Sequence, residues 1–287
     1  MKNLLFSFLV LTIIAEVQGQ QYVWGVPVAA AEIIKPEVKP NHIMWKKTLF
    51  RRLNLTQKQN QPFNSKNSEL SALMIQGAKE GLLQPYMSDS CLRPMPDDEF
   101  IMALQYEVQG GGDDFGGDFG GGFGGGFGDE AEEESEGDGK KYNDIDPTEF
   151  NKIYIKEDLI FDRNRSRMYY YIRSLTLGIP ANPNYEIQFE KKVASFRYDD
   201  VVKLFRGPYK EKALWFNEQN PGAHVNLADA LELRLFNAPV IGVSNSQNLD
   251  IRQMYGDQIA QDPMKAMILQ EQAEMELMEY EHYLWEN

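Results

Sequence analysis

Few residues in this sequence could carry out chemistry. The 287-residue chain has three histidines, His42, His224 and His282, and one cysteine, Cys91. A serine or cysteine nucleophile needs a neighbouring base, and neither a G-x-S-x-G turn nor an H-E-x-x-H helix occurs in the chain. Cys91 has no second cysteine with which to form an internal disulfide, so an idle or buried thiol is the simplest interpretation. The sequence therefore predicts no catalytic residue and no cofactor.

One pair of residues has the spacing of a metal site. Glu279-x-x-His282 matches the motif of di-iron carboxylate proteins, which need two such motifs and two further glutamates. The motif occurs once, on a predicted helix that also carries Glu271, Glu274, Glu276 and Glu281. A solvated acidic helix face is the favoured interpretation, and no metal ligand is predicted. A periplasmic metal-dependent enzyme that uses His282 remains an alternative.

A tract rich in glycine, phenylalanine and acidic residues interrupts the chain at residues 109–143. Gly120, Gly122 and Gly125 match the dinucleotide-binding pattern G-x-G-x-x-G, but the neighbouring carboxylates would repel a pyrophosphate. We predict a disordered insert, because ordering so many glycines costs more entropy than the tract can offset by burial. Ten Asp and Glu between residues 110 and 139 account for most of the net charge of −14. No basic footprint for nucleic acid is present.

The N-terminus has the order of a secretory signal peptide, predicted over residues 1–19. Lys2 precedes an apolar stretch from Leu4 to Ile14, and Val17-Gln18-Gly19 supplies residues that a signal peptidase accepts. Cleavage is expected between Gly19 and Gln20. No cysteine follows the apolar stretch, so the chain lacks the residue that carries the lipid of a bacterial lipoprotein. An exported protein without its own anchor is predicted.

After the signal peptide, the sequence predicts an extended segment at 20–41 and then a mostly helical lobe at 42–108. Apolar residues at intervals of three and four predict a helix from His42 to Leu53. A second helix is predicted from Glu69 to Lys79, with Ser68 as its N-cap and Gly81 as its stop. Pro96 and Asp97 introduce a short third helix that runs to about residue 105.

Residues 144–287 predict an α+β lobe, and the whole chain is α+β. Residues 153–161 and 168–179 predict a β-hairpin around a polar turn at 162–165. A strand at 193–196, helices at 198–205 and 226–235 and a strand at 239–243 follow. Asp262 and Pro263 then begin a long helix with one apolar face, for which core packing is the favoured role and adaptable binding the alternative. That face contains Met264, Met267, Ile268, Met275, Met278 and Trp285.

Several segments together resemble the GldN/PorN family of the type IX secretion system. They are Ile43-Met44-Trp45-Lys46-Lys47, Leu53-Asn54-Leu55, Asn60-Gln61-Pro62-Phe63, Ile155-Lys156-Glu157-Asp158, Phe161-Asp162, Ile172-Arg173, Leu177-Gly178-Ile179, Tyr198-Asp199-Asp200-Val201-Val202 and His282-Tyr283-Leu284-Trp285-Glu286. Each motif is short, but their order and spacing extend from residue 42 to the end of the chain.

The resemblance implies a periplasmic protein, peripheral to the outer membrane, that forms a ring with itself and with a GldK/PorK-like lipoprotein. Contact with a GldM/PorM-like motor-linked subunit is also implied, and membrane attachment would come only through the lipoprotein. The family has no established catalytic residues to transfer. Trp45 and Trp285 are the candidate interface anchors, with core packing as the alternative for each. A secreted adhesin or carrier that uses the Gly-Phe tract is a further alternative function.

Overall fold

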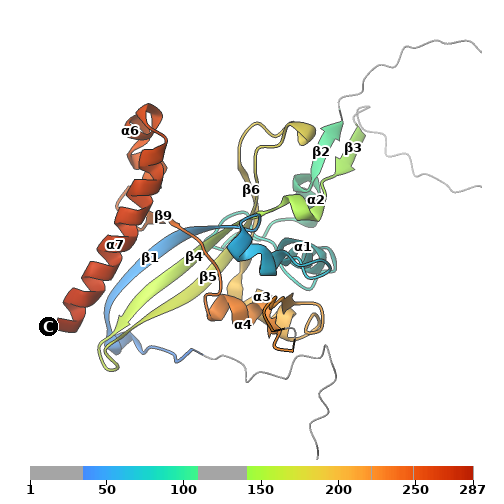
Figure 1. Cartoon of the computed structure of the whole chain (residues 1–287). Coiled ribbons are helices and arrows are strands. Elements are labelled where there is room, and N and C mark those ends of the chain that lie inside the picture. The colour runs from blue at the N-terminus through green and yellow to red at the C-terminus, as the bar shows by residue number, and fades with distance from the viewer. Residues whose placement is uncertain (1–34, 109–140, 221, 248, 287) are drawn as a thin grey trace, which may run out of the picture.

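A five-stranded antiparallel sheet forms the centre of the molecule, in the order β6-β5-β4-β1-β9 (Figure 1). The computed structural model describes residues 35–108, 141–220, 222–247 and 249–286, apart from the side chains of residues 108, 141, 285 and 286. The predicted signal peptide, most of the extended segment that follows it and residues 109–140 of the predicted insert lie outside these ranges.

The β-hairpin predicted at the centre of the chain is confirmed. It consists of β4 (Lys152–Asp162) and β5 (Arg167–Ile179), which pair from Lys152↔Gly178 to Asp162↔Arg167. The Asp162 carboxylate closes the turn by accepting hydrogen bonds from the backbone N–H groups of Asn164 (2.8 Å) and Arg165 (3.4 Å). A side chain that bonds backbone two residues later mimics a backbone turn, which explains the tight reversal.

The helix predicted from His42 to Leu53 is wrong, because these residues form β1 (Ile43–Asn54). Trp45, Leu49 and Leu53 lie on one face of the strand, four residues apart. A four-residue interval fits one helix face and also every second inward position of a strand. Lys47, which is exposed, and Arg51, which is half-buried, occupy the positions in between on the same face, so the two-residue apolar period was hidden.

Two of the predicted helices in the first lobe are present with altered ends. α1 (Leu70–Lys79) begins after Glu69 at the N-cap position, so Ser68 is not its cap, and Gly81 ends it with a φ of 71°. Glycine adopts this left-handed conformation without steric cost. α2 (Asp97–Ala103) is shorter than predicted.

Two short strands border the part of the chain that the structure does not describe. β2 (Gln105–Val108) pairs with β3 (Lys141–Asp144), with Val108 opposite Lys141. Residues 141–143, which the sequence interpretation assigned to the insert, therefore belong to a strand.

The other predicted helices and strands are present, although the helix predicted to end at Leu235 ends at Glu232, and residues 214–215, 225–226, 251–254 and 256–261 form elements that were not predicted. Asn226 caps α4 through a hydrogen bond from the Ala228 N–H (2.9 Å), and Asp262 accepts a hydrogen bond from the Met264 N–H (3.0 Å) at the start of α7. The elements are β6 (Lys191–Arg197), α3 (Tyr198–Arg206), β7 (Leu214–Trp215), β8 (Val225–Asn226), α4 (Leu227–Glu232), β9 (Val240–Val243), α5 (Ile251–Met254), α6 (Gly256–Gln261) and α7 (Met264–Glu286). The α+β class is confirmed.

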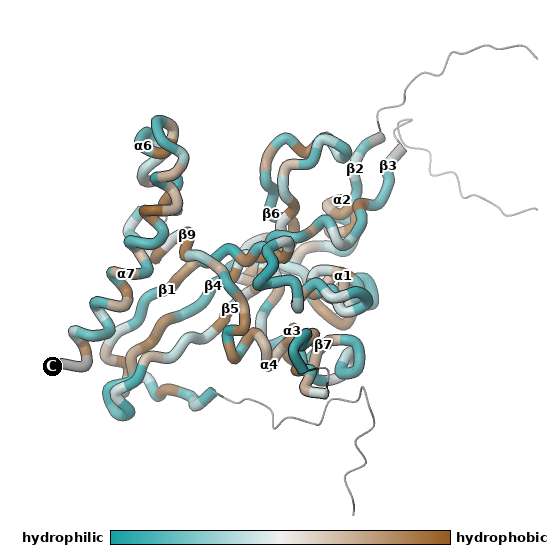
Figure 2. Tube along the Cα trace, viewed as in Figure 1, coloured by the Kyte–Doolittle hydropathy of each residue, from teal (hydrophilic) through white to brown (hydrophobic). Residues whose placement is uncertain are grey.

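Two apolar clusters stabilise the fold. The larger one joins α1, α3 and α4 to the sheet through Phe63, Met74, Ile153, Phe196 and Leu231, among others. The smaller one consists of Leu49, Leu159, Val240 and Leu277 and lies where α7 meets the sheet. In Figure 2 hydrophobic and hydrophilic residues are mixed along the whole of α7, which lies beside β1 and β9 and away from α1 and α3.

Candidate functional site

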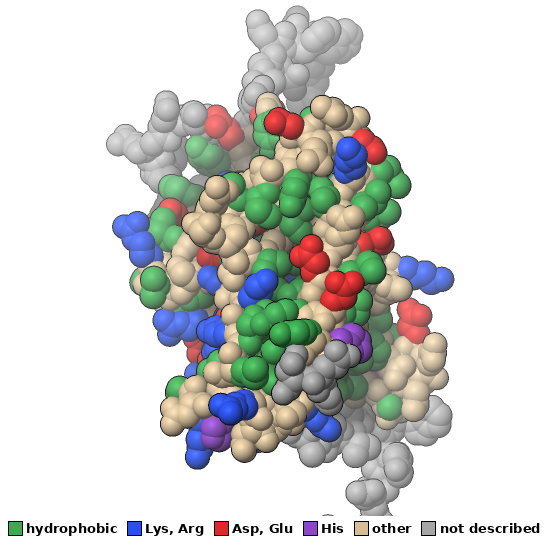
Figure 3. All heavy atoms as spheres, turned by 90° about the vertical axis from the view of Figure 1, so that its left-hand side faces the viewer, with side chains coloured by type: hydrophobic (Ala, Val, Ile, Leu, Met, Phe, Trp, Pro, Cys, Tyr) green, Lys and Arg blue, Asp and Glu red, His purple; other side chains and the backbone are tan. Residues whose placement is uncertain are grey.

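The outer face of α7 carries a stripe of exposed apolar side chains. Met264, Met267, Met275 and Met278 are 52–60 % exposed, and Ile268 lies beside them. The favoured core role of this stripe is therefore wrong. Residues that α7 buries lie on its other side, at Ala266, Gln270, Leu277 and Leu284. Figure 3 shows hydrophobic side chains interspersed with acidic ones over the face of the molecule that α7 occupies.

α7 is held to the sheet by a narrow set of contacts. Leu277 enters the smaller apolar cluster, and the Tyr280 ring lies 4.8 Å from the Trp45 ring. The Glu274 carboxylate accepts hydrogen bonds from the Val240 N–H (3.0 Å) and from Arg51 (2.9 Å). Most of the described side chains of α7 are exposed, so much of the helix surface is available to another molecule.

A buried ion cluster lies beneath this contact, between the two apolar clusters. The Glu157 side chain has no exposed surface and pairs with Arg51 (2.7 Å) and Arg234 (2.5 Å). Arg51 continues to Glu274 on α7, and the Arg234 guanidinium lies 4.2 Å from the centre of the Tyr170 ring. The cluster thus connects β4, β1, the residues after α4 and α7 through charge-assisted hydrogen bonds.

A hollow of about 460 Å³ separates α7 from the end of the sheet. Its walls are Trp45, Leu277 and Tyr280 on one side and Ile251 and Tyr255 on the other. Apolar and aromatic walls of this kind accommodate an aliphatic or aromatic side chain of a partner.

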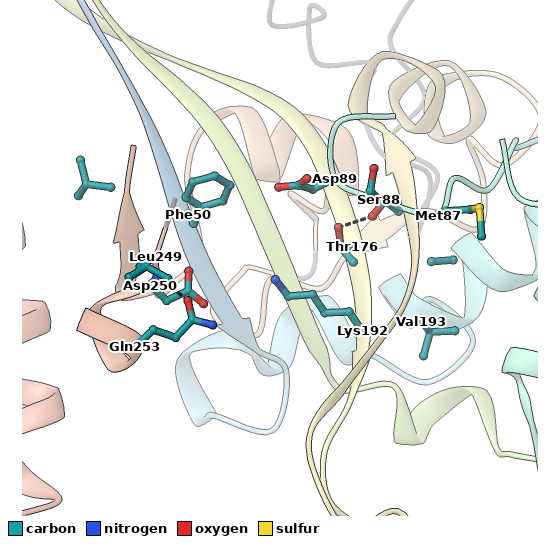
Figure 4. Close-up of a pocket in the computed structure, with 13 residues that line it drawn as sticks. Phe50, Met87, Ser88, Asp89, Thr176, Lys192, Val193, Leu249, Asp250 and Gln253 are labelled. Carbon is teal, nitrogen blue, oxygen red and sulfur yellow. Dashed lines mark hydrogen bonds between the residues drawn. The ribbon is translucent and has the colours of Figure 1, made fainter. Parts of the chain in front are cut away.

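A second hollow, of about 360 Å³, lies on the opposite face of the sheet (Figure 4). Lys192 crosses it between Asp89 and Asp250, and the Phe50 ring forms part of its wall. The hydroxyls of Thr176 and Ser195, 2.7 Å apart, satisfy each other. Among the described residues that line this hollow, none is a histidine or a cysteine.

The residues singled out for chemistry are placed as follows. Cys91 is buried, and burial raises the pKa of its thiol above the ordinary value. His224 stacks on Phe216 at 4.7 Å and accepts a hydrogen bond from the Asn217 N–H. His42 ends the short 3-10 helix Pro40–His42, and His282 is exposed on α7. Among the described residues, no three His, Cys, Asp or Glu side chains gather as metal ligands would.

The two candidate anchors, Trp45 and Trp285, lie on different elements. Trp45 is half-buried between the sheet and α7, where it contacts Tyr280 and receives Lys47 over its ring at 5.8 Å. Trp285 belongs to the last turn of α7, but its side chain lies outside the described residues. The anchor role of both residues stays a prediction.

Sequence reasoning did not identify Arg51, Glu157 and Arg234. In the sequence, Glu157 stands between apolar residues of a predicted strand, at a position that alternation assigns to the buried face. A charge at such a position predicts a buried partner of opposite sign. Glu157 alone indicated from the sequence that a buried ion cluster exists. Its partner Arg51 can be identified only once the register of β1 and β4 is known.

Within the described residues, no helix is both long and apolar enough to span a lipid bilayer.

Comparison with known proteins identifies the family. No curated protein matches the chain significantly. The family model described as "Gliding motility associated protein GldN" matches residues 38–286, which include every helix and strand of the structure. GldN is a component of the type IX secretion and gliding-motility machinery. The chain therefore belongs to the GldN family.

Proposed function

We propose that this chain is a non-catalytic periplasmic subunit of the type IX machinery. It assembles into a ring and is held at the outer membrane by a GldK/PorK-like lipoprotein, with a further contact to a GldM/PorM-like motor-linked subunit. The observation that carries the proposal is the exposed methionine face of α7. Flexible, polarisable methionines suit adaptable protein interfaces, and exposed apolar patches of this kind mark binding sites.

Assembly explains why α7 is apolar on two sides. The face with Leu277 packs on the sheet, whereas the face with Met267 and Met275 contacts solvent. A ring of identical subunits requires two different surfaces on each subunit, one for each neighbour. A lipoprotein requires a further surface, so an outward apolar helix is a suitable candidate for one of these contacts.

The test replaces the outer methionines without disturbing the inner face. Met267→Gln/Met275→Gln keeps side-chain length and helix propensity but removes apolar surface. We expect the double variant to stay folded by circular dichroism and to co-purify with at least about tenfold less lipoprotein. Met87→Gln/Met102→Gln, at exposed positions outside α7, is the matched control and should co-purify as the wild type does.

The proposal fails if the wild-type chain runs as a free monomer in envelope extracts and its deletion leaves secretion unchanged. Normal co-purification of the α7 variant would leave assembly intact but remove α7 from the interface.

Trp45→Ala and Trp285→Ala test the two anchors separately. A folded variant that loses both the lipoprotein and secretion identifies an interface anchor. Unfolding identifies a core residue, and for Trp45 its contact with Tyr280 makes partial release of α7 the expected result.

A further inference from the structure

The turn between β4 and β5 and the start of β1 lie side by side and form one end of the molecule (Figure 1). The Arg163 N–H donates a hydrogen bond to the His42 carbonyl (2.8 Å), and Ile43 lies opposite Asp162. Six exposed cations lie at this junction or along the strands that lead to it, and we call the set the basic tip: Lys39, Lys46, Arg163, Arg165, Arg167 and Arg173. In Figure 3, Lys and Arg side chains gather in the lower part of the molecule.

The carboxylates within the basic tip point inward and are already paired. Asp158 accepts from Lys46 (2.9 Å), Arg173 (2.7 Å) and Thr48 (2.8 Å) and is 6 % exposed. Asp162 has no exposed surface and pairs with Arg165 at 3.0 Å. Glu37 is the exposed carboxylate of this region. The surface that meets solvent is therefore strongly positive, although the chain carries a net charge of −14.

The basic tip has the shape and composition of a surface that meets a membrane. It is the protruding end of a hairpin, and none of its four arginines lines either hollow described above. The core of a protein–protein interface is depleted of charged residues and contains buried apolar anchors. Attraction to anionic lipid headgroups needs neither, because each Lys or Arg near the leaflet contributes independently.

The acidic remainder of the chain does not cancel this attraction. At physiological salt the Debye length is about 8 Å, so charges farther from the leaflet than the basic tip are largely screened. α7 packs on the face of the hairpin that carries Leu159 and Tyr170, whereas Lys46 and Arg173 pair with Asp158 on the other face. The unequal charge distribution would thus orient the molecule with the hairpin turn toward the membrane.

We propose that the basic tip binds the anionic phospholipid headgroups of a membrane surface directly. This contact goes beyond the proposed function, in which the lipoprotein alone attaches the chain to the membrane. Binding is electrostatic and reversible, and it involves no insertion of the turn into the acyl region, because the turn residues Arg163-Asn164-Arg165-Ser166 are polar.

The test is co-sedimentation of the purified full chain with vesicles. One set contains phosphatidylcholine alone, and the other contains equal parts of phosphatidylcholine and phosphatidylglycerol. We expect binding to the anionic vesicles only, with the bound fraction falling steeply as salt is raised. Failure to bind the anionic vesicles at low salt overturns the proposal, and so does binding that high salt leaves unchanged.

A charge variant locates the contact. Within the described residues, Arg163 and Arg167 form no salt bridge, so Arg163→Ser/Arg167→Ser should keep the fold. The variant is expected to bind anionic vesicles about 30-fold more weakly, since each cation near the leaflet contributes about 1 kcal/mol. Lys66→Ser/Lys210→Ser makes the same change in net charge beside α1 and α3 and should bind as the wild type does.

Equal weakening by both double variants would show that net charge rather than the basic tip controls binding, which contradicts the proposal. Tighter binding to immobilised polyglutamate than to the vesicles would assign the tip to an acidic protein instead. Neither measurement involves the lipoprotein, so both outcomes are independent of the assembly test.

Discussion

At the scale of single residues, the buried carboxylate of Glu157 connects three separate parts of the chain. Its carboxylate faces Arg51 and Arg234, and Arg51 reaches Glu274 on α7. When one partner of a buried ion cluster is removed, the remaining charges stay buried without compensation. The cluster therefore makes the position of α7 depend on one residue of β4.

Glu157→Gln is expected to lower the free energy of unfolding by about 3 kcal/mol. For a chain of this size that corresponds to a fall in melting temperature of roughly 6–12 °C, measurable by circular dichroism. Glu211→Gln, at an exposed position, is the matched control and should change stability by less than about 0.5 kcal/mol. Equal melting temperatures for the two variants would contradict a structural role for the cluster.

Asp158 predicts a dependence of stability on pH. Burial alone would raise its pKa, but hydrogen bonds from Lys46, Arg173 and Thr48 outweigh burial and lower it. A carboxyl whose pKa is lower in the folded chain stabilises the fold above its unfolded pKa, and this stabilisation is lost as pH falls through the folded value.

We therefore expect the wild type to lose stability below about pH 4, and Asp158→Asn to lose less over the same range. Denaturant titrations at several pH values measure both. The variant should already be less stable at neutral pH, and a wild-type stability that does not change on acidification would argue against the ion pairs.

Cys91 predicts a difference in reactivity between the folded and unfolded chain. Burial raises the pKa of its thiol, which lowers the thiolate fraction at neutral pH, and the residue is 4 % exposed. Iodoacetamide should therefore alkylate Cys91 slowly in the native protein and rapidly in denaturant, as followed by mass spectrometry. Rapid labelling without denaturant would indicate local opening of the segment around Cys91.

At the scale of elements, the two faces of α7 predict opposite responses to substitution. Leu277→Ala removes a buried contact with Leu49 and Val240, so it should destabilise the docking of α7 by about 2–3 kcal/mol. Met278→Ala changes an exposed neighbour and should have little effect. Hydrogen exchange of the α7 amides distinguishes the two variants, and equal protection in both would mean that Leu277 does not hold the helix.

The sequence was sufficient where one physical rule dominated an element. The hairpin of β4 and β5 follows from alternation around a polar turn, and α4 follows from the Asn226 cap. β1 could not be predicted because two positions on the face that carries Trp45, Leu49 and Leu53 are occupied by Lys47 and Arg51. Lys47 remains exposed and lies over the Trp45 ring of the same strand, whereas Arg51 pairs with Glu157 of β4, a contact that depends on the tertiary structure.

The exposed apolar face of α7 could be predicted only in part from the sequence, for a related reason. The apolar stripe of α7 is visible in the sequence, but whether a stripe is buried depends on what packs against it. α7 has two apolar sides, and the side with Ala266 and Leu277 is the one that is buried. The spacing of apolar residues along the helix does not distinguish the buried side from the exposed side.

At the scale of the whole molecule, the structure predicts that residues 109–140 can be removed. Val108 and Lys141 are opposite each other at the ends of β2 and β3, so a two-residue Asn-Gly turn can join them as a short hairpin. We expect the shortened chain to melt within about 4 °C of the full chain, a shift equivalent to about 1 kcal/mol. A much larger fall would show that the removed residues contribute to the core.

The position of β1 has a consequence for how the chain is made. β1 is the first strand of the sheet to be synthesised, yet it lies between β4 and β9. Its Thr48 bonds Asp158, 110 residues later, and Ser244, 196 residues later. Pairings so distant in sequence close slowly, and a nascent chain cannot complete its sheet until residue 243 has emerged. Until then the sheet is incomplete, which would suit the export that the N-terminal sequence predicts, because an exported chain crosses the membrane before it folds.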